Sequence, residues 1–164
     1  KEYIIKDGIL LRGLGGMESQ LRTGLPGVAN FRASAWNRAP IDRMANLNIE
    51  PGDSSFEDII SSIEKGVYME SNRSWSIDDY RNKFQFGCEY GKLIEDGKLT
   101  APIKGATLAG NGPEVLKYAS MVGNDSQLDP GIGICGKDGQ SVPVCVGQPT
   151  LKVDKLTVGG TQAG

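Results

Sequence analysis

Few side chains in this sequence have the chemistry for a reaction. Three cysteines, Cys88, Cys135 and Cys145, are spread over 164 residues that contain no histidine. A Ser-His-Asp or Cys-His site, and a zinc site with an imidazole from this chain, are therefore excluded. Cys135 differs from the other two because it ends an apolar run just before a glycine turn, where a thiol can be open to a ligand. A buried structural cysteine is the commoner role on composition, and both interpretations stay open.

The remaining polar motifs are weaker candidates for a site. Catalytic zinc usually has three protein ligands and a water, so at least two ligands besides Cys135 would have to come from elsewhere. The carboxylate pairs Asp78-Asp79 and Glu95-Asp96 stand beside turn signals, where Asp favours local hydrogen bonds, so we assign them to turns. Residues 131–137 are glycine-rich but fit neither glycine pattern of a phosphate-binding loop, so phosphate binding is not expected.

Composition narrows the class of protein. Eighteen Lys and Arg against 20 Asp and Glu give a net charge of −2, which argues against nucleic acid as a partner. No apolar run approaches the ~18 residues of a membrane span, and the first residues do not form a signal peptide, so we expect no membrane partner. Three cysteines are too few for a secreted disulfide scaffold, which favours a reducing, cytoplasmic location.

Turn dipeptides indicate hairpins. Residues 3–11 form two apolar runs around Asp7-Gly8, and residues 93–99 repeat the pattern around Asp96-Gly97. Recurring turn chemistry is one explanation, and an internal duplication of a β-hairpin unit is the other. Further strands are expected at 43–50, 74–79, 83–95, 98–108, 131–135, 141–146 and 151–158. Alternation along residues 83–95 places Cys88 in the core.

Short helices separate these hairpins. One is expected over residues 17–22. A second begins with a capping box of Ser54 and Glu57, has an apolar face from Phe56 to Ile63 and ends at Gly66. A third starts near Pro113, turns residues 115–122 inward and ends at residue 123. No βαβ rhythm is present, so we predict an α+β fold with mainly antiparallel β-sheet and two or three short helices.

Long motifs in the chain resemble the C-terminal part of the TldD/PmbA proteins, a family historically labelled modulators of DNA gyrase. The resemblance covers nearly all of the 164 residues. It is carried by Arg43-Met44-Ala45-Asn46, Pro51-Gly52-Asp53, and the stretches 93–108, 110–114, 120–125, 135–144 and 147–151.

The resemblance implies a zinc metalloprotease of the TldD branch. Such an enzyme is a cytoplasmic peptidase of peptides or unfolded segments, working as a homodimer or as a TldD/TldE-type heterodimer. In the family, two histidines of an HExxxH helix and one cysteine hold the zinc, and that cysteine matches Cys135. No His exists here, so residues 1–164 are interpreted as a C-terminal segment without the HExxxH region, inactive alone and with no catalytic residue in this chain. The substrate-binding residues are unknown.

The sequence also departs from the family pattern. Residues 74–78 replace a glycine-rich stretch, and Cys145 stands where glycine is expected, on a strand that could face Cys135 across the turn. A second function hypothesis is a noncatalytic PmbA/TldE-type scaffold that binds a TldD-like partner. The cysteine motif favours the peptidase.

Overall fold

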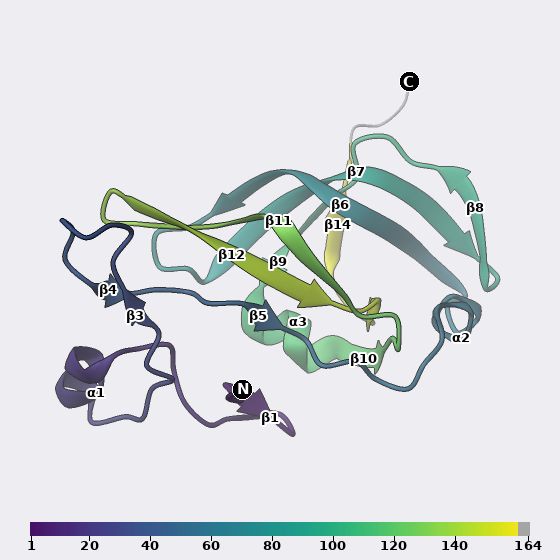
Figure 1. The fold of residues 1–164 in the computed structure, drawn as a ribbon. Coiled ribbons are helices and arrows are strands. Elements are labelled where there is room, and N and C mark those ends of the chain that lie inside the picture. Colours follow the sequence, from purple (N-terminus) through teal and green to yellow (C-terminus); the bar gives the residue numbers. More distant parts are fainter. Residues whose placement is uncertain (161–164) are drawn as a thin grey trace. The chain divides into compact units, whose positions relative to one another are not determined.

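The computed structural model describes residues 1–160, with the backbone alone for residues 131 and 132 (Figure 1). The chain divides into two compact units, each made of two stretches of sequence. The first unit comprises Lys1–Glu50 and Ser126–Gln148, and the second comprises Pro51–Asp125 with the chain from Pro149 onward. The candidate site lies in the first unit, because that unit contains Cys135.

The first unit is built on one long hairpin. Strands β11 (Gln127–Lys137) and β12 (Gln140–Gln148) pair antiparallel, and the short strand β5 (Leu47–Asn48) adds to β12 in parallel. Two small hairpins, β1 (Ile5–Lys6) with β2 (Ile9–Leu10) and β3 (Phe31–Arg32) with β4 (Ile41–Asp42), flank helix α1 (Met17–Thr23).

The second unit contains a five-stranded antiparallel sheet. Its strands are β6 (Lys65–Ile77), β7 (Lys83–Glu95), β8 (Lys98–Pro102), β9 (Thr107–Asn111) and β14 (Thr157–Gly159), with β7 at the centre. Helices α2 (Phe56–Ser61) and α3 (Gly112–Tyr118) and the pair β10 (Ala119–Val122) with β13 (Leu151–Val153) complete it. The mainly antiparallel α+β prediction is confirmed. No helix among residues 1–160 is long and apolar enough to cross a membrane.

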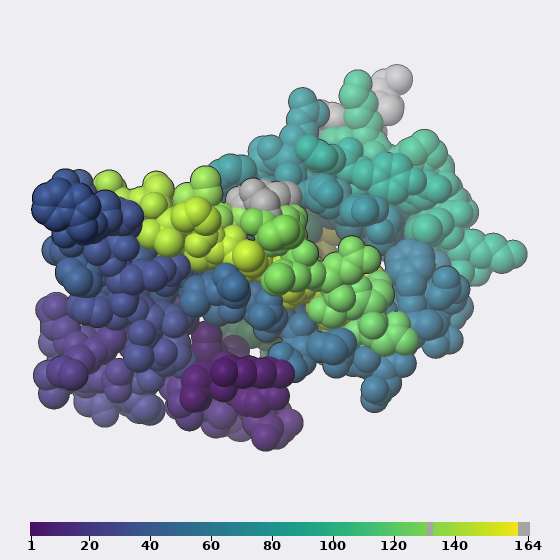
Figure 2. All heavy atoms as spheres, viewed as in Figure 1, coloured from purple at the N-terminus to yellow at the C-terminus, as the bar shows by residue number. Residues whose placement is uncertain are grey.

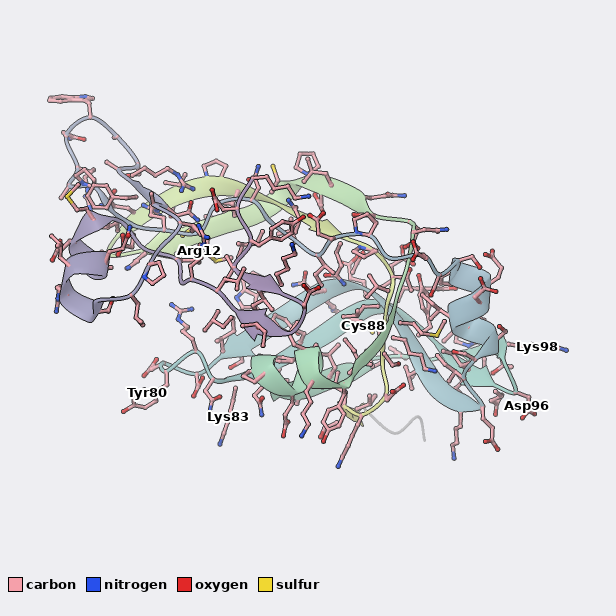
Figure 3. The ribbon with its side chains drawn as sticks, turned by 90° about the horizontal axis from the view of Figure 1, so that it is seen from below. Arg12, Tyr80, Lys83, Cys88, Asp96 and Lys98 are labelled. Atoms are coloured by element: carbon pink, nitrogen blue, oxygen red, sulfur yellow. The ribbon has the colours of Figure 1, made fainter. Side chains whose placement is uncertain are left out.

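Hairpin turns follow one rule in both units. The pairs Asp7-Gly8, Asp96-Gly97 and Asp138-Gly139 all have positive φ at both residues, between 49° and 75°. A two-residue turn with this geometry matches the right-handed twist of its strands, and Asp-Gly adopts it readily. The third occurrence is consistent with recurring turn chemistry as the reason for the likeness between the first two hairpins. Figure 3 shows Asp96 and Lys98 at one end of β7, Tyr80 and Lys83 at the other, and Cys88 between them.

The predicted boundaries of α2 were wrong at both ends. The N-cap is Ser55, whose hydroxyl accepts from the Asp58 N–H while the Asp58 carboxylate accepts from the Ser55 N–H. Ser54 instead uses its backbone, bonding Val122 and Asn124. Gly66 does not end the helix, because it lies in β6 and pairs with Ile94.

The third helix is shorter than predicted. It ends at Tyr118, and Ala119–Val122 is strand β10 because its backbone pairs with Leu151–Val153. Leu116 does not pack inward, since 51% of its surface is exposed. The N-terminal part of the prediction is confirmed: the Asn111 side chain caps the helix and Pro113 lies in its first turn.

Several strands are also shorter or split. Of residues 43–50, only Leu47–Asn48 form a strand, and each of the predicted strands 98–108 and 151–158 is divided in two. Cys88 is half-buried instead of fully in the core, and it pairs with Asn72 where the β6–β7 register shifts. Ile59, Ile60, Ile94 and Ala106 form the buried apolar core of the second unit. The first unit buries Cys135, Val144, Arg43 and Gln140.

Candidate metal-ligand site

Cys135 lies on the buried face of the β11–β12 hairpin. Its Cα partner is Val142, and directly opposite residues of an antiparallel pair share a face. Gln140 and Val144, two residues to either side of Val142, therefore share this face, and both are buried. Only 8% of Cys135 is exposed. The thiol is thus held inside the first unit and close to the Asp138-Gly139 turn.

A backbone segment, residues 42–49, runs along this hairpin and is bonded to it repeatedly. The Met44 N–H donates to the Cys135 Sγ at 3.4 Å, and the Cys145 N–H donates to the Asn46 side-chain oxygen at 2.9 Å. Farther along, the Ile49 N–H donates to the Gly147 carbonyl at 2.9 Å. The Arg43-Met44-Ala45-Asn46 motif therefore docks segment 42–49 against the strands around Cys135.

Arg43 is the most deeply buried charged residue of the first unit, with 2% of its surface exposed. Its Nη2 donates to the carbonyl oxygens of Cys135 and Gln140, the latter at 2.9 Å. Its Nε and Nη1 have no hydrogen-bond partner among the described residues. A buried cation that is only partly bonded is costly, so its position calls for an explanation beyond packing.

Gln140 completes the buried polar group. Its Oε1 accepts from the Ser34 N–H and its Nε2 donates to the Ala39 carbonyl, both at 2.9 Å. Figure 2 shows the consequence at the surface, where the hairpin tip lies side by side with the dark blue segment that precedes β4. Sequence reasoning missed Arg43 and Gln140, because local patterns give no sign that a single polar residue will be buried.

Asp42 anchors the start of segment 42–49. The Ser19 hydroxyl and the Gly16 N–H donate to its carboxylate, and together with the nearby Lys137 charge they hold the pKa of Asp42 below its ordinary value. Lys137 also donates to the Asp42 carbonyl oxygen at 3.0 Å. Asp42 thereby connects α1 to the end of β11.

The other two cysteines do not join Cys135. All three thiols are free, and Cys88 lies in the second unit. Cys145 is three residues along β12 from Val142, the partner of Cys135, which is an offset of about 10 Å and an odd step to the opposite face. A disulfide needs Cα atoms within about 7 Å. The strand of Cys145 does face that of Cys135 across the turn, but the two thiols are too far apart for a disulfide.

The fit of this site to a metal is partial. Among residues 1–160, no three His, Cys, Asp or Glu side chains come together in a way that could hold a metal ion. Cys135 by itself has the right chemistry for one zinc position, because thiolate sulfur is a preferred zinc ligand. Cys135 is thus the one side chain of this buried face, among the described residues, whose chemistry suits zinc.

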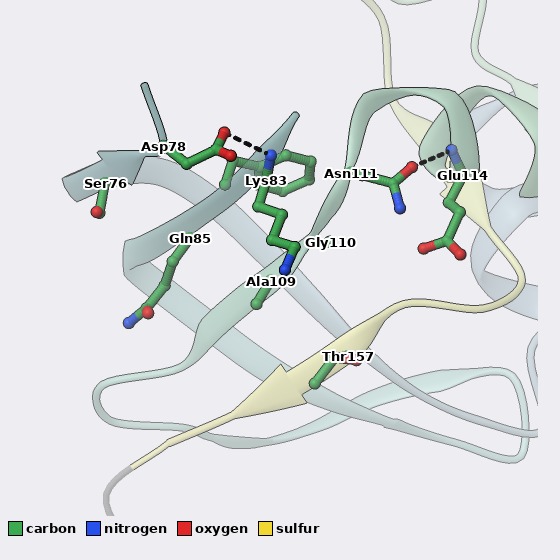
Figure 4. Close-up of a pocket in the computed structure, with 10 residues that line it drawn as sticks. Ser76, Asp78, Lys83, Gln85, Ala109, Gly110, Asn111, Glu114 and Thr157 are labelled. Atoms are coloured by element: carbon green, nitrogen blue, oxygen red, sulfur yellow. Dashed lines mark hydrogen bonds between the residues drawn. The ribbon is translucent and has the colours of Figure 1, made fainter. Parts of the chain in front are cut away.

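The remaining sequence candidates have local structural roles. Asp78 accepts from the N–H groups of Asn82 and Lys83, and Glu95 accepts from the Thr100 hydroxyl at 2.6 Å. Figure 4 shows Asp78 and Asn111 in a pocket of about 470 Å³, each bonded to a backbone N–H of its own turn or helix. Residues 131–137 lie within β11, so no helix follows them to bind phosphate. These groups assemble no second site.

Comparison with known proteins agrees with this fold and these motifs. The family model of the PmbA/TldA metallopeptidase C-terminal domain matches residues 1–160. The chain is 47% identical over 161 residues to a metalloprotease TldD homologue of Haemophilus influenzae, covering 96% of this chain and 33% of that protein. It is 31% identical over 157 residues to a zinc metalloprotease TldD homologue of Saccharolobus solfataricus, covering 96% and 35%.

Solved structures share the fold. A Thermotoga maritima protein described as a candidate modulator of a DNA gyrase matches with a TM-score of 0.70 and 19% identity, over 96% of this chain and 32% of that one. TldE from Thermococcus kodakarensis matches with a TM-score of 0.67 and 22% identity, over 86% and 29%. The fold and the match along the sequence define a metallopeptidase-family domain. The chain belongs to the PmbA/TldA family as its C-terminal domain, and it spans about a third of the length of these curated relatives.

Proposed function

We propose that residues 1–164 are the C-terminal segment of a TldD-like zinc-dependent peptidase, in which Cys135 supplies one zinc ligand. The observation that carries the proposal is the free Cys135 thiol, held on a hairpin by a backbone N–H donor to its sulfur. The names of the two relatives above, metalloprotease and zinc metalloprotease, support the same activity. The two histidine ligands and the glutamate that acts on water would come from an HExxxH segment preceding this one.

The contribution of this chain to the reaction is to hold one metal ligand. Zinc, when bound, polarises a peptide carbonyl and lowers the pKa of a bound water. The Cys135 thiolate would supply one ligand to the metal and would neutralise part of its charge. The Met44 N–H donates to the sulfur, and this hydrogen bond would limit the directions from which Cys135 can bind a metal. The β11–β12 hairpin keeps the sulfur at a fixed place relative to that donor.

The proposal also covers the substrate class, the oligomeric assembly and the cellular location. The substrate class is peptides or unfolded segments, and the assembly is a homodimer or a TldD/TldE-type heterodimer in the cytoplasm. The match to TldE is consistent with such a partner. Three unpaired cysteines are consistent with a reducing compartment.

The second candidate function is a noncatalytic TldE-type scaffold that binds a TldD-like subunit. It is favoured by the fold shared with TldE, since one fold can serve both roles. An HExxxH sequence upstream of this chain would support the peptidase, and its absence would support the scaffold.

The decisive test is Cys135→Ser in the full-length protein. Serine keeps the size, but its hydroxyl does not ionise readily near neutral pH and is a poor zinc ligand. We expect zinc affinity to fall at least about tenfold and hydrolysis of an unstructured peptide to fall with it, while circular dichroism stays unchanged. Zinc content is measured by atomic emission after dialysis against a chelator.

Cys88→Ser and Cys145→Ser are the matched controls. Both thiols are half-buried and free, and neither is a ligand in this proposal, so both variants should keep zinc and activity. Normal zinc and normal turnover in the Cys135 variant would make the scaffold the better account.

A further inference from the structure

The immediate surroundings of Cys135 are built around one buried guanidinium. We propose that Arg43 is a positioning residue for Cys135, which acts by fixing the Met44 N–H on the sulfur so that the thiolate presents one direction to a metal. The inference rests on the proposed function, because it assumes that Cys135 is a ligand.

Arg43 joins the two strands on either side of the hairpin turn. Its Nη2 donates to the carbonyl of Cys135 on β11 and to that of Gln140 on β12. Both carbonyls belong to residues of the same buried face. Because Met44 follows Arg43 directly, anchoring the guanidinium also fixes the Met44 N–H at 3.4 Å from the Cys135 Sγ.

The second observation is that the guanidinium is incompletely bonded. Arg43 is 2% exposed, yet its Nε and Nη1 have no partner among the described residues. A fully paired or apolar residue would be the more stable choice at a purely structural position. The negative charge that a metal-bound cysteine carries lies on the residue whose carbonyl Arg43 already contacts. A Cys135 thiolate would therefore place a negative charge on a residue that this partly bonded guanidinium already contacts.

A lysine at position 43 cannot make the same set of hydrogen bonds as Arg43. A guanidinium presents several N–H groups in a rigid plane, whereas an ammonium is a point charge on a flexible stem. Arg43→Lys keeps the positive charge but loses the planar geometry, so the Met44 N–H is no longer held on the sulfur. Partners that orient a metal ligand typically change metal affinity about 10–100-fold when they are removed.

The experiment uses the full-length protein with Co²⁺ in place of zinc. The charge-transfer band between cysteine sulfur and cobalt reports the environment of the Cys135 sulfur independently of activity. We expect Arg43→Lys to lower Co²⁺ affinity about 10–100-fold and to shift this band, with native circular dichroism. Arg38→Lys is the matched control, because the Arg38 guanidinium donates to the carbonyls of Asp138 and Gly139 at the turn of the same hairpin and not to Cys135 or Gln140.

The Cys135→Ser variant distinguishes the proposed ligand role of Cys135 from the proposed positioning role of Arg43. If it leaves the band and affinity unchanged, Cys135 is not a ligand and the proposed function fails. If it abolishes the band while a folded Arg43→Lys keeps wild-type affinity and band position, only the role of Arg43 is overturned.

A measurement on the wild-type protein covers the case in which Arg43→Lys does not fold. With ¹¹³Cd bound, a hydrogen bond from the Met44 N–H to a metal-bound Cys135 sulfur transmits a scalar coupling between the cadmium nucleus and that amide proton. Its detection supports the proposal. An assigned Met44 amide without coupling to a cadmium that does couple to the Cys135 side chain overturns it.

Discussion

Asp42 gives the first unit a dependence on pH that can be read from its contacts. The Ser19 hydroxyl and the Gly16 N–H bind the ionised carboxylate and lower its pKa. A carboxyl whose pKa is lowered by folding adds stability above the pKa it has in the unfolded chain. That stability is lost as the pH falls through the pKa of the folded state.

Asp42→Asn should therefore destabilise the chain at neutral pH and much less in acid. Hydrogen bonds to a charged group contribute about 1.5–3 kcal/mol, and Asp42 is half-buried, so we expect a loss of about 1–2 kcal/mol in the free energy of unfolding near pH 7. The difference from wild type should shrink toward about pH 3, below the ordinary pKa of Asp. Urea denaturation at both pH values measures it. Asp7→Asn, at an exposed turn, is the control, and an equal loss for both variants would contradict the assignment.

Of the individual residues at the site, only some could be predicted from the sequence. Cys135 could be singled out from its place before a glycine turn, and its burial against Gln140 and Val144 agrees with the ordinary fate of a cysteine. Arg43 could not be recognised, because burial of an arginine depends on carbonyl groups 92 and 97 residues later in the chain. Local sequence patterns do not predict contacts between residues so far apart in the chain.

Among the elements, helix α2 offers the sharpest test of a local rule. Ser55 is the N-cap, and its hydroxyl satisfies the Asp58 N–H at 3.0 Å. We expect Ser55→Ala to lower the free energy of unfolding by about 1 kcal/mol, because a free amide group is left at the helix start. Ser54→Ala should have a smaller effect, since Ser54 bonds through its backbone. Thermal denaturation of the two variants distinguishes them, and a larger loss at Ser54 would restore the capping box expected from the sequence.

Local patterns predicted elements where local chemistry decides. Strand β7 occupies the predicted residues 83–95, because its alternation matches a sheet with one more apolar face. The Asp-Gly turns were recognised for the same reason. The predicted strand at 43–50 and the predicted C-terminal end of α3 were wrong. Partners distant in the sequence decide whether those backbones pair. The shift of the cap from Ser54 to Ser55 is a matter of one residue, which patterns do not resolve.

For the whole molecule, the exposed apolar side chains of the first unit predict association. Met17 and Leu21, one turn apart on α1, are 77% and 79% exposed, and Leu25 is 66% exposed. With their neighbours they line a pocket of about 530 Å³. Exposed apolar patches mark surfaces that bind other proteins, so we expect the isolated chain to self-associate in sedimentation experiments at increasing concentration.

Leu21→Glu should weaken this association about tenfold or more by placing a charge in the patch. Glu18→Gln, on the same helix with a highly exposed side chain, is the control and should leave it unchanged. A wild-type chain that stays monomeric at high concentration and melts cooperatively would contradict the prediction.

The alternation of the chain between its two units also has a consequence during synthesis. The chain leaves the first unit after residue 50 and returns to it only at residue 126. The Cys135 carbonyl, to which Arg43 donates, is synthesised 92 residues after Arg43. At roughly 5–20 residues per second, this delay on the ribosome is about 5–20 s. During that interval the first fifty residues have apolar side chains without their hairpin, which makes them a target for chaperones that recognise nascent chains. The surroundings of the thiol are completed late, after the central sheet strands of the second unit have already been translated.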